Sequence, residues 1–223
     1  MQIDMHCHSY YSRDGISSPE ALLRQAKKRG LDGIALTDHN NTRGWQRAEK
    51  AADELGLLLI KGEEIKIKEN NETIGEILAY FINREINPKG KKIEQIIKEI
   101  KDQGGIAIIA HPHHWKKPFK KLEECKNLVD GVEVFNSRSQ SKLGNELSLN
   151  FAKQNNLPMT AGSDGHTTCE IGRSYVEVEA QTLDEFRKAI LEKRIKISGK
   201  QTTFLIQILS PLAKTIHFFN EPK

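Results

Sequence analysis

Ile3-Asp4-Met5-His6-Cys7-His8 is a short, mostly apolar strand near the start of the chain that ends in two histidines one residue apart. Side chains at positions i and i+2 of an extended strand point to the same face. His6 and His8 can therefore present their ring nitrogens to one metal ion where the strand gives way to a loop. Cys7 lies between them, so we expect its side chain to point to the opposite face and to pack, not to bind metal.

Similar groups of imidazoles and carboxylates follow other apolar, strand-like runs. A single histidine or carboxylate in a loop is usually a surface, cap or turn residue, so no one of them indicates a site. Their repetition after strand upon strand predicts a polynuclear metal site with nitrogen and oxygen donors. The groups are Asp14, Thr37-Asp38-His39-Asn40, Gly62-Glu63-Glu64, Ala110-His111-Pro112-His113-His114 and Gly162-Ser163-Asp164-Gly165-His166.

Length and composition favour one domain with a sizeable core. A chain of 223 residues can form a single α/β barrel without disulfides. The three cysteines show no paired spacing, which favours a reducing, cytoplasmic location. No run is apolar enough for a signal peptide or a membrane span. The net charge of +4 favours anionic substrates, and we expect the lysine-rich stretches 89–92 and 116–121 to be solvated surface.

Strand-like runs alternate with helical patterns along the chain. This alternation predicts parallel strands, and about seven β–α units predict a closed or nearly closed barrel whose chemistry lies at the strand carboxyl ends. The strand-like runs are 2–5, 33–37, 57–67, 76–82, 106–110, 131–135, 158–161 and 175–178. The helical patterns are 19–30, 42–55, 93–103, 119–127, 139–155 and 183–193, the first with Ser18 as N-cap and the last with a capping box at Thr182 and Glu185.

Two segments depart from a regular barrel. Residues 69–72 read as a hairpin turn between two strands, not as a crossover helix. The tail, residues 203–223, is apolar, and we expect it to pack on the barrel or at a subunit interface. The predicted organisation is a single domain over residues 1–223, with the barrel at about residues 1–200.

The motifs resemble those of the PHP family, the polymerase-and-histidinol-phosphatase superfamily of metal-dependent phosphoesterases. The matching motifs, in the same order as in the family, are His6-Cys7-His8-Ser9 with Ser12 and Asp14, Thr37-Asp38-His39-Asn40, Ala110-His111-Pro112-His113 and Gly162-Ser163-Asp164-Gly165-His166. The resemblance spans residues 4 to about 178 and is closer to the small stand-alone members. It implies a distorted (β/α)7, TIM-like barrel with two or three divalent ions, and zinc, manganese and iron all suit such donors.

The resemblance also implies an arrangement of the metal ligands. His6, His8, Glu63 and Asp164 would hold the first ion. Glu63 would bridge to a second ion that His111 also binds. Asp14, His39 and His166 would hold the third ion. Among these residues, Glu63, Asp164 and His166 are the expected catalytic residues.

The ligands of the second ion are less defined, because Glu76 stands where many family members have a histidine. Either Glu76 or Glu133 completes this shell, or the second ion binds weakly. A solvent-facing position on a strand is an equal alternative for Glu133.

The expected substrate contacts are Arg173, His113 and Arg138, with Arg173 first, because a guanidinium fork fits a phosphate. Arg13 and Arg43 are further candidates. The predicted activity is hydrolysis of a phosphate ester by a metal-bridging hydroxide. The ester would belong to a nucleotide, an oligonucleotide end or a small phosphomonoester. The alternatives are a histidinol-phosphate phosphatase, an amidohydrolase-like hydrolase, and an inactive metal-binding regulatory module.

Overall fold

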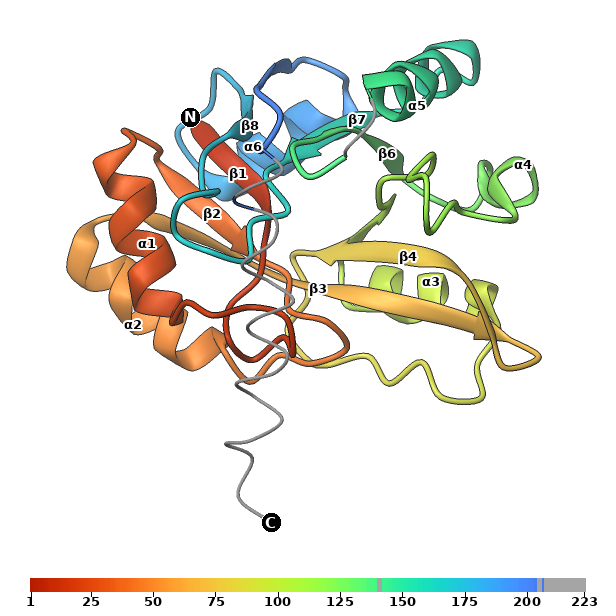
Figure 1. Ribbon diagram of the computed structural model, residues 1–223, viewed down its shortest axis with the longest axis horizontal. Helices are drawn as coiled ribbons and strands as arrows, with labels where there is room; N and C mark the ends of the chain where they lie inside the picture. The colour runs from red at the N-terminus through yellow and green to blue at the C-terminus, as the bar shows by residue number, and fades with distance from the viewer. Residues whose placement is uncertain (140–141, 204–205, 207–223) are drawn as a thin grey trace.

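A computed structural model describes residues 1–139, 142–203 and 206 of the chain. Nine strands form one sheet in the order β7-β6-β5-β4-β3-β2-β1-β8-β9 (Figure 1). The sheet curls into a nearly closed barrel, because β7 also lies beside β1 and β8. The strands are β1 Gln2–Cys7, β2 Gly33–Leu36, β3 Leu58–Glu69, β4 Glu72–Tyr80, β5 Ile106–Ile109, β6 Gly131–Asn136, β7 Met159–Gly162, β8 Ser174–Glu177 and β9 Lys196–Gly199.

The TIM-like barrel prediction is confirmed, with differences in how the strands pair. β1, β2 and β3 pair in parallel, as do β5, β6 and β7. β4 runs antiparallel to both of its neighbours, and β8 runs antiparallel to β1 and β9. The short strand β9 is absent from the predicted set. These antiparallel strands are the distortion from a regular barrel of β–α units.

The helices occupy the predicted segments with shorter bounds. α1 begins with Pro19 at its first position, and its cap Ser18 accepts a hydrogen bond from the Ala21 backbone N–H. α1 and α2 lie side by side on one flank of the sheet (Figure 1). The helices are α1 Pro19–Lys28, α2 Trp45–Leu55, α3 Ile93–Asp102, α4 Leu122–Cys125, α5 Lys142–Gln154 and α6 Leu183–Leu191.

Three hydrophobic clusters hold helices on the sheet, and the smallest joins α5 to β6 through Phe151 and Val132. The largest one joins the apolar faces of α1, α2 and α3 to strand residues that include Ile65 and Ile67. The second joins residues of β1, β4, β5 and β8 to α6 around Phe186. Cys7 is fully buried in the largest cluster, as expected for a packing residue.

The β3–β4 hairpin extends β3 well beyond the barrel rim. Residues 58–61 of β3 pair with β2, whereas residues 62–69 pair with β4. The predicted turn is present, and Asn70 and Asn71 adopt φ values of 47° and 64°, which two-residue hairpin turns require.

The predicted role of the tail 203–223 lies almost wholly outside the described residues. Within the part of the chain that the structure describes, no helix is both long and apolar enough to cross a bilayer.

Candidate metal centre

Glu64 occupies the centre of the histidine cluster, on the part of β3 that has passed the end of β2. Its carboxylate is 1% exposed. Its Oε2 atom lies 2.8 Å from His39 Nδ1 and 3.4 Å from His8 Nε2. Its Oε1 atom lies 3.1 Å from His111 Nε2 and 3.6 Å from His6 Nε2. One buried carboxylate therefore contacts imidazoles that belong to, or follow, three different strands.

Asp164 lies on the other side of the same histidines. Its Oδ1 atom lies 3.2 Å from His8 Nε2, 3.7 Å from His6 Nε2 and 3.5 Å from His166 Nδ1. The Asp164 backbone has a φ of 52°, in the left-handed region that asparagine and aspartate tolerate better than most residues. The loop after β7 is thereby turned so that this carboxylate faces the cluster.

Asp14 completes the cluster from the loop after β1. Its Oδ1 atom lies 3.5 Å from His39 Nε2 and 3.4 Å from His166 Nε2. This geometry brings together the three residues expected to hold the third ion. Three sets of side chains can each offer ligand atoms within 4.8 Å of one another: His8, His39 and His166; His6, His8 and Asp164; and His39, Glu64 and Glu76.

Several inward-facing atoms lack a hydrogen-bond partner among the described residues. They include His6 Nε2, His8 Nε2 and Glu64 Oε2, all of them buried. Buried polar atoms are normally paired, so three such atoms facing one another need an occupant. A divalent cation would satisfy imidazole nitrogens and carboxylate oxygens together. The donor set therefore fits a polynuclear metal centre.

Glu133 orients His6 and the start of the loop after β5. Its Oε1 atom lies 2.9 Å from His6 Nδ1, which leaves Nε2 of that ring facing the cluster. Its Oε2 atom accepts hydrogen bonds from the backbone N–H of His111 and from Asn136 Nδ2. Carboxylates commonly hold metal-binding histidines in this way. Glu133 is buried, so the solvent-facing alternative is wrong, and both of its oxygens are engaged by His6, the His111 backbone and Asn136.

Asp38 supports His8 through Ser12. The Ser12 hydroxyl lies 3.1 Å from His8 Nδ1 and donates to Asp38 Oδ1. Asp38 also accepts hydrogen bonds from the backbone N–H and the hydroxyl of Ser9. A buried carboxylate thus fixes the loop that follows β1, and with it the ring of His8.

The charges in the cluster shift its pKa values in opposite directions. Burial, with His166 and His39 nearby, lowers the pKa of His8 to about 3, so this ring is neutral and can bind metal. Burial opposes protonation of His39, but Glu64 and Asp14 outweigh it and raise its pKa to about 10. Glu64 has a pKa well below its usual range, because His39 and His6 outweigh the effect of burial. The carboxylates that attract protons to these rings would equally attract divalent cations.

The structure corrects the prediction that Glu63 bridges two ions. Glu63 points to the opposite face of β3, where its carboxylate accepts a hydrogen bond from the Ile86 backbone N–H. Glu64 takes the central position instead. The alternation of Glu63, Ile65 and Ile67 along one face was the available signal, because this apolar face packs beneath the helices. Of the two neighbouring carboxylates, Glu64 is therefore the one in contact with the predicted histidine ligands.

Glu76 reaches the cluster from β4. Its Oε2 atom lies 3.5 Å from His111 Nε2, and its Oε1 atom lies 3.5 Å from Lys66 Nζ. Glu76 faces Lys66 directly across the β3–β4 pair. Of the two alternatives for the second ion, the geometry favours Glu76 as a ligand and Glu133 as support for His6.

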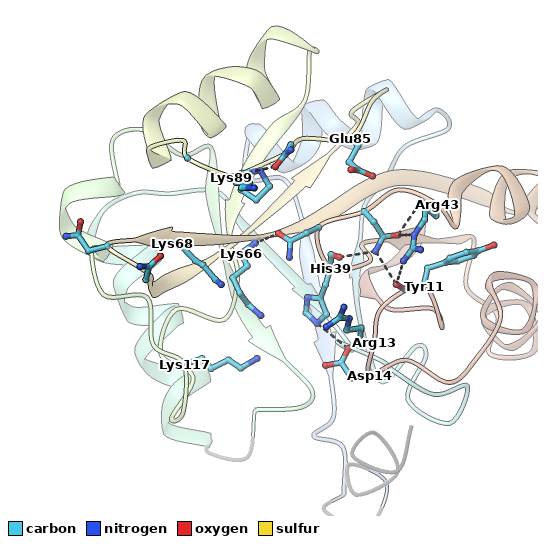
Figure 2. A pocket seen from close by; sticks show the side chains of 17 residues that line it. Tyr11, Arg13, Asp14, His39, Arg43, Lys66, Lys68, Glu85, Lys89 and Lys117 are labelled. Atoms are coloured by element: carbon cyan, nitrogen blue, oxygen red, sulfur yellow. Dashed lines mark hydrogen bonds and ion pairs between the residues drawn. The ribbon is translucent and has the colours of Figure 1, made fainter. Parts of the chain in front are cut away.

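A cavity of about 1610 Å³ opens beside the cluster (Figure 2). Asp14 and His39 belong to both, so the cavity leads directly to the candidate ligands. Lys89 and Lys117 are exposed, as expected of these lysine-rich stretches, and both also line this cavity. The cationic side chains in its wall are Arg13, Arg43, Lys66, Lys68, Lys89 and Lys117.

The three expected substrate contacts lie elsewhere. Arg173 donates to the backbone carbonyls of Cys169 and Gln201, each at 3.4 Å. His113 Nδ1 lies 3.1 Å from the Ser148 hydroxyl. Among the residues that the structure describes, neither of these side chains lines the cavity.

Arg138 pairs with the fully buried Glu170 at 3.0 Å. The same carboxylate accepts hydrogen bonds from the backbone N–H groups of His166 and Thr167. Arg138 therefore supports the loop that carries His166, a role that sequence spacing does not reveal.

Comparisons with known proteins agree with this geometry. The profile of the PHP domain family matches residues 4–199. An uncharacterised protein of Methanocaldococcus jannaschii is 36% identical over 168 residues, covering 67% of this chain and 90% of that protein. A 5′-3′ exoribonuclease of Haemophilus influenzae is 34% identical over 105 residues, covering 47% of this chain and 37% of that protein. A two-domain protein of Bacteroides vulgatus that contains a predicted PHP-like metal-dependent phosphoesterase matches in structure with a TM-score of 0.74, at 24% identity over 90% of this chain and 65% of that chain.

The fold and the site together define the class of protein: a distorted TIM-like barrel with imidazoles and carboxylates gathered at one end of its strands. Within that class, this chain belongs to the PHP family. Two solved structures of similar fold, at 24% and 21% identity, are named for metal-dependent phosphoesterases. The cluster around Glu64 offers nitrogen and oxygen donors that could hold a metal ion.

Proposed function

We propose that this protein hydrolyses phosphate esters with two or three divalent ions held around Glu64. One observation carries the proposal: a buried carboxylate in contact with four histidines lies beside a cavity lined by cations. Bound ions would lower the pKa of a water molecule and stabilise the negative charge that develops on the phosphoryl oxygens. Zinc, manganese and iron remain the candidate metals, and a cytoplasmic location remains a prediction.

The chain's own residues have separate tasks in this proposal. His6, His8, Asp14, His39, His111, Asp164 and His166 hold the ions together with Glu64 and Glu76. Glu133 fixes the ring of His6, so that only its Nε2 atom faces the ions.

Arg13 and Arg43 replace Arg173 as the candidate contacts for the substrate phosphate. Both line the cavity that Asp14 and His39 share with the cluster (Figure 2). Arg43 donates to the Tyr11 carbonyl and to Asn41 Oδ1, two neutral partners, so its positive charge is not cancelled by them. A planar guanidinium can donate two hydrogen bonds to one phosphate.

The test is a substrate panel with the metal-loaded protein. The panel contains p-nitrophenyl phosphate, bis(p-nitrophenyl) phosphate, histidinol phosphate and a p-nitroanilide. We expect hydrolysis of phosphate esters that requires added zinc, manganese or iron and is lost in Glu64→Gln. Glu63→Gln is the matched control and should stay active.

The other outcomes of the panel identify the alternatives. Hydrolysis of the anilide alone would indicate an amidohydrolase-like enzyme. A strong preference for histidinol phosphate would indicate a histidinol-phosphate phosphatase. Full metal loading without any hydrolysis would indicate a metal-binding regulatory module and contradict the proposal.

A further inference from the structure

Two lysines contact the same oxygen of Glu76, a carboxylate of the candidate metal centre. Lys66 Nζ lies 3.5 Å and Lys117 Nζ lies 3.9 Å from Glu76 Oε1. The Glu76 side chain is 3% exposed, and Oε1 has no hydrogen-bond partner among the described residues. The other oxygen, Oε2, lies 3.5 Å from His111 Nε2. One side of this carboxylate therefore faces a candidate metal ligand, and the other side faces two positive charges.

The pairing of the strands holds Lys66 in this position. Lys66 and Glu76 are direct partners across the antiparallel pair of β3 and β4. Side chains of such partners lie on the same face of the sheet, with Cβ atoms about 5 Å apart. The Lys66 backbone N–H also donates to Asn40 Oδ1 in the loop after β2. The contact between Lys66 and Glu76 therefore follows from the register of the hairpin.

Lys117 approaches Glu76 from a different segment, the loop after β5. Figure 2 shows Lys66 and Lys117 reaching towards the same part of the cavity that both side chains line. Both lysines are partly exposed, at 32% and 53%, so each ammonium can turn towards solvent. Neither lysine is therefore fixed permanently against the carboxylate.

Glu64 and Asp164 have partners of another kind. Within the described part of the chain, every ion pair of these two carboxylates is with an imidazole. A neutral imidazole has a lone pair and can bind the same ion as the carboxylate, whereas a lysine ammonium has three donors and no acceptor. An ion at Glu64 or Asp164 thus gains the neighbouring side chains as ligands. An ion at Glu76 Oε1 must instead displace two ammonium groups.

We propose that Lys66 and Lys117 compete with a divalent ion for Glu76, so that the site formed by Glu64, Glu76 and His111 fills last and releases its ion most readily. The inference rests on the proposed function, because it concerns the order in which the same centre takes up its ions. The lysines turn towards solvent as the ion binds, since like charges repel each other. Any step that needs this last ion then responds to the concentration of free metal, while the other ions stay bound.

The experiment measures zinc uptake by the full chain after its metal has been removed with a chelator. Calorimetric titration resolves ions that bind with different affinities, and elemental analysis after dialysis against buffered free zinc counts them. Lys66→Gln is the test variant, because the amide keeps most of the side chain and removes its charge. Lys68→Gln is the matched control. Lys68 is two residues further along the same face of β3 and lines the same cavity, and the described residues include no carboxylate paired with it.

We expect wild type to bind its last zinc ion more weakly than its first. Lys66→Gln should tighten the last step about two- to fivefold, the range for a cross-strand or exposed ion pair, and leave the first step unchanged. Lys117→Gln should act in the same direction but less, because its contact is longer and its side chain is more exposed. Lys66→Arg should keep the last step weak. At a salt concentration of about 0.15 M, which screens charges beyond about 8 Å, Lys68→Gln should change neither step.

A second measurement separates competition from a structural role of Lys66. The ion pair with Glu76 stabilises the folded chain only while no metal ion holds the carboxylate. Lys66→Gln should therefore lower the melting temperature in EDTA by about 1–4 °C, and this loss should disappear at saturating zinc. A lysine that only supports the hairpin would give the same loss in both conditions.

Three results would overturn the inference. Lys66→Gln could bind the last ion as wild type does, or more weakly. Lys68→Gln could match Lys66→Gln, which would assign the effect to the overall charge of the cavity. Equal melting losses in EDTA and in zinc would make Lys66 a structural residue. Inactivity on the phosphate-ester panel would reject the proposed function and leave these binding measurements valid, whereas ester hydrolysis with one zinc affinity in all variants would reject only the competition at Glu76.

Discussion

Glu63 and Glu64 are adjacent on β3, and their carboxylates lie on opposite faces of the strand. Glu64 contacts His39 at 2.8 Å, whereas Glu63 accepts a hydrogen bond from the Ile86 backbone N–H at 2.9 Å. Two chemically identical neighbours therefore have different tasks. This pair offers an internal control for every test of the metal centre.

Replacing Glu64 by glutamine should remove activity, and the same change at Glu63 should not. A neutral amide supplies neither the charge nor the two equivalent oxygens that join histidines from three strands. We expect Glu64→Gln to lose bound metal and at least about a hundredfold in kcat/KM, or roughly 2.7 kcal/mol. Elemental analysis and ester hydrolysis measure the two effects. Equal losses in Glu63→Gln would show that the cluster is not centred on Glu64.

The stability of the protein should fall with rising pH because of Glu63. Burial, with Glu85 nearby, raises the pKa of Glu63 to about 8, although the bond from Ile86 opposes the shift. Its ordinary pKa is 4.5, so between about pH 4.5 and 8 the folded state keeps a proton that the unfolded state has released. The free energy of unfolding should then fall by up to about 1.4 kcal/mol per pH unit from this group.

Glu63→Gln provides the measurement, since its amide resembles the protonated acid. Urea unfolding of wild type and Glu63→Gln at pH 6 and pH 8 separates this group from others that titrate. The variant should gain stability relative to wild type as the pH rises. A constant difference between the two proteins would show that Glu63 is ionised in the folded state.

Glu133→Gln should weaken metal binding without removing a ligand. A neutral amide oxygen accepts a weaker hydrogen bond from His6 Nδ1–H than the charged carboxylate does. The substitution also alters the hydrogen bond from the His111 backbone N–H. Loss of such support typically costs about 10- to 100-fold in metal affinity. Calorimetric titration of the metal-free protein measures this change. Glu177→Gln on β8, whose carboxylate contacts Gln2, is a control and should bind metal normally.

Arg138→Leu should lower stability, not substrate affinity. Glu170 is fully buried, and the loss of its partner would leave a buried charge that still accepts hydrogen bonds from the His166 loop. Breaking a buried pair costs about 3–5 kcal/mol. Chemical denaturation of Arg138→Leu and of Arg173→Leu should show a large loss only in the first. If Arg138→Leu instead raises KM at unchanged stability, then Arg138 contacts the substrate.

Chelation should lower the melting temperature, and added metal should restore it. The cluster exists only in the folded chain, so ions that bind it stabilise the folded state by about 2.7 kcal/mol at a hundred times their Kd. Thermal unfolding with EDTA, followed by zinc, manganese or iron in separate samples, measures the effect. The ion that gives the largest recovery identifies the preferred metal. Insensitivity to all three ions would contradict a metal centre.

Local patterns were enough to predict most of the fold. Apolar runs with Gly and Pro boundaries located eight of the nine strands, and the Ser18-Pro19 cap located the first residue of α1. Strand β9 was missed because Lys196–Gly199 is short and polar enough to resemble a loop. The direction of β4 followed from its hairpin turn, since a two-residue connection can join only antiparallel strands.

The sequence by itself determined the kinds of ligand, because imidazoles and carboxylates after successive strands must meet at one end of a barrel. The alternation of Glu63, Ile65 and Ile67 already indicated which face of β3 is apolar, but only the tertiary structure showed that the opposite face carries Glu64 into the histidine cluster. It also placed Lys66, Lys68, Lys89 and Lys117 around one cavity and paired Arg138 with Glu170. These contacts join residues far apart in the chain, and local periodicity carries no information about them.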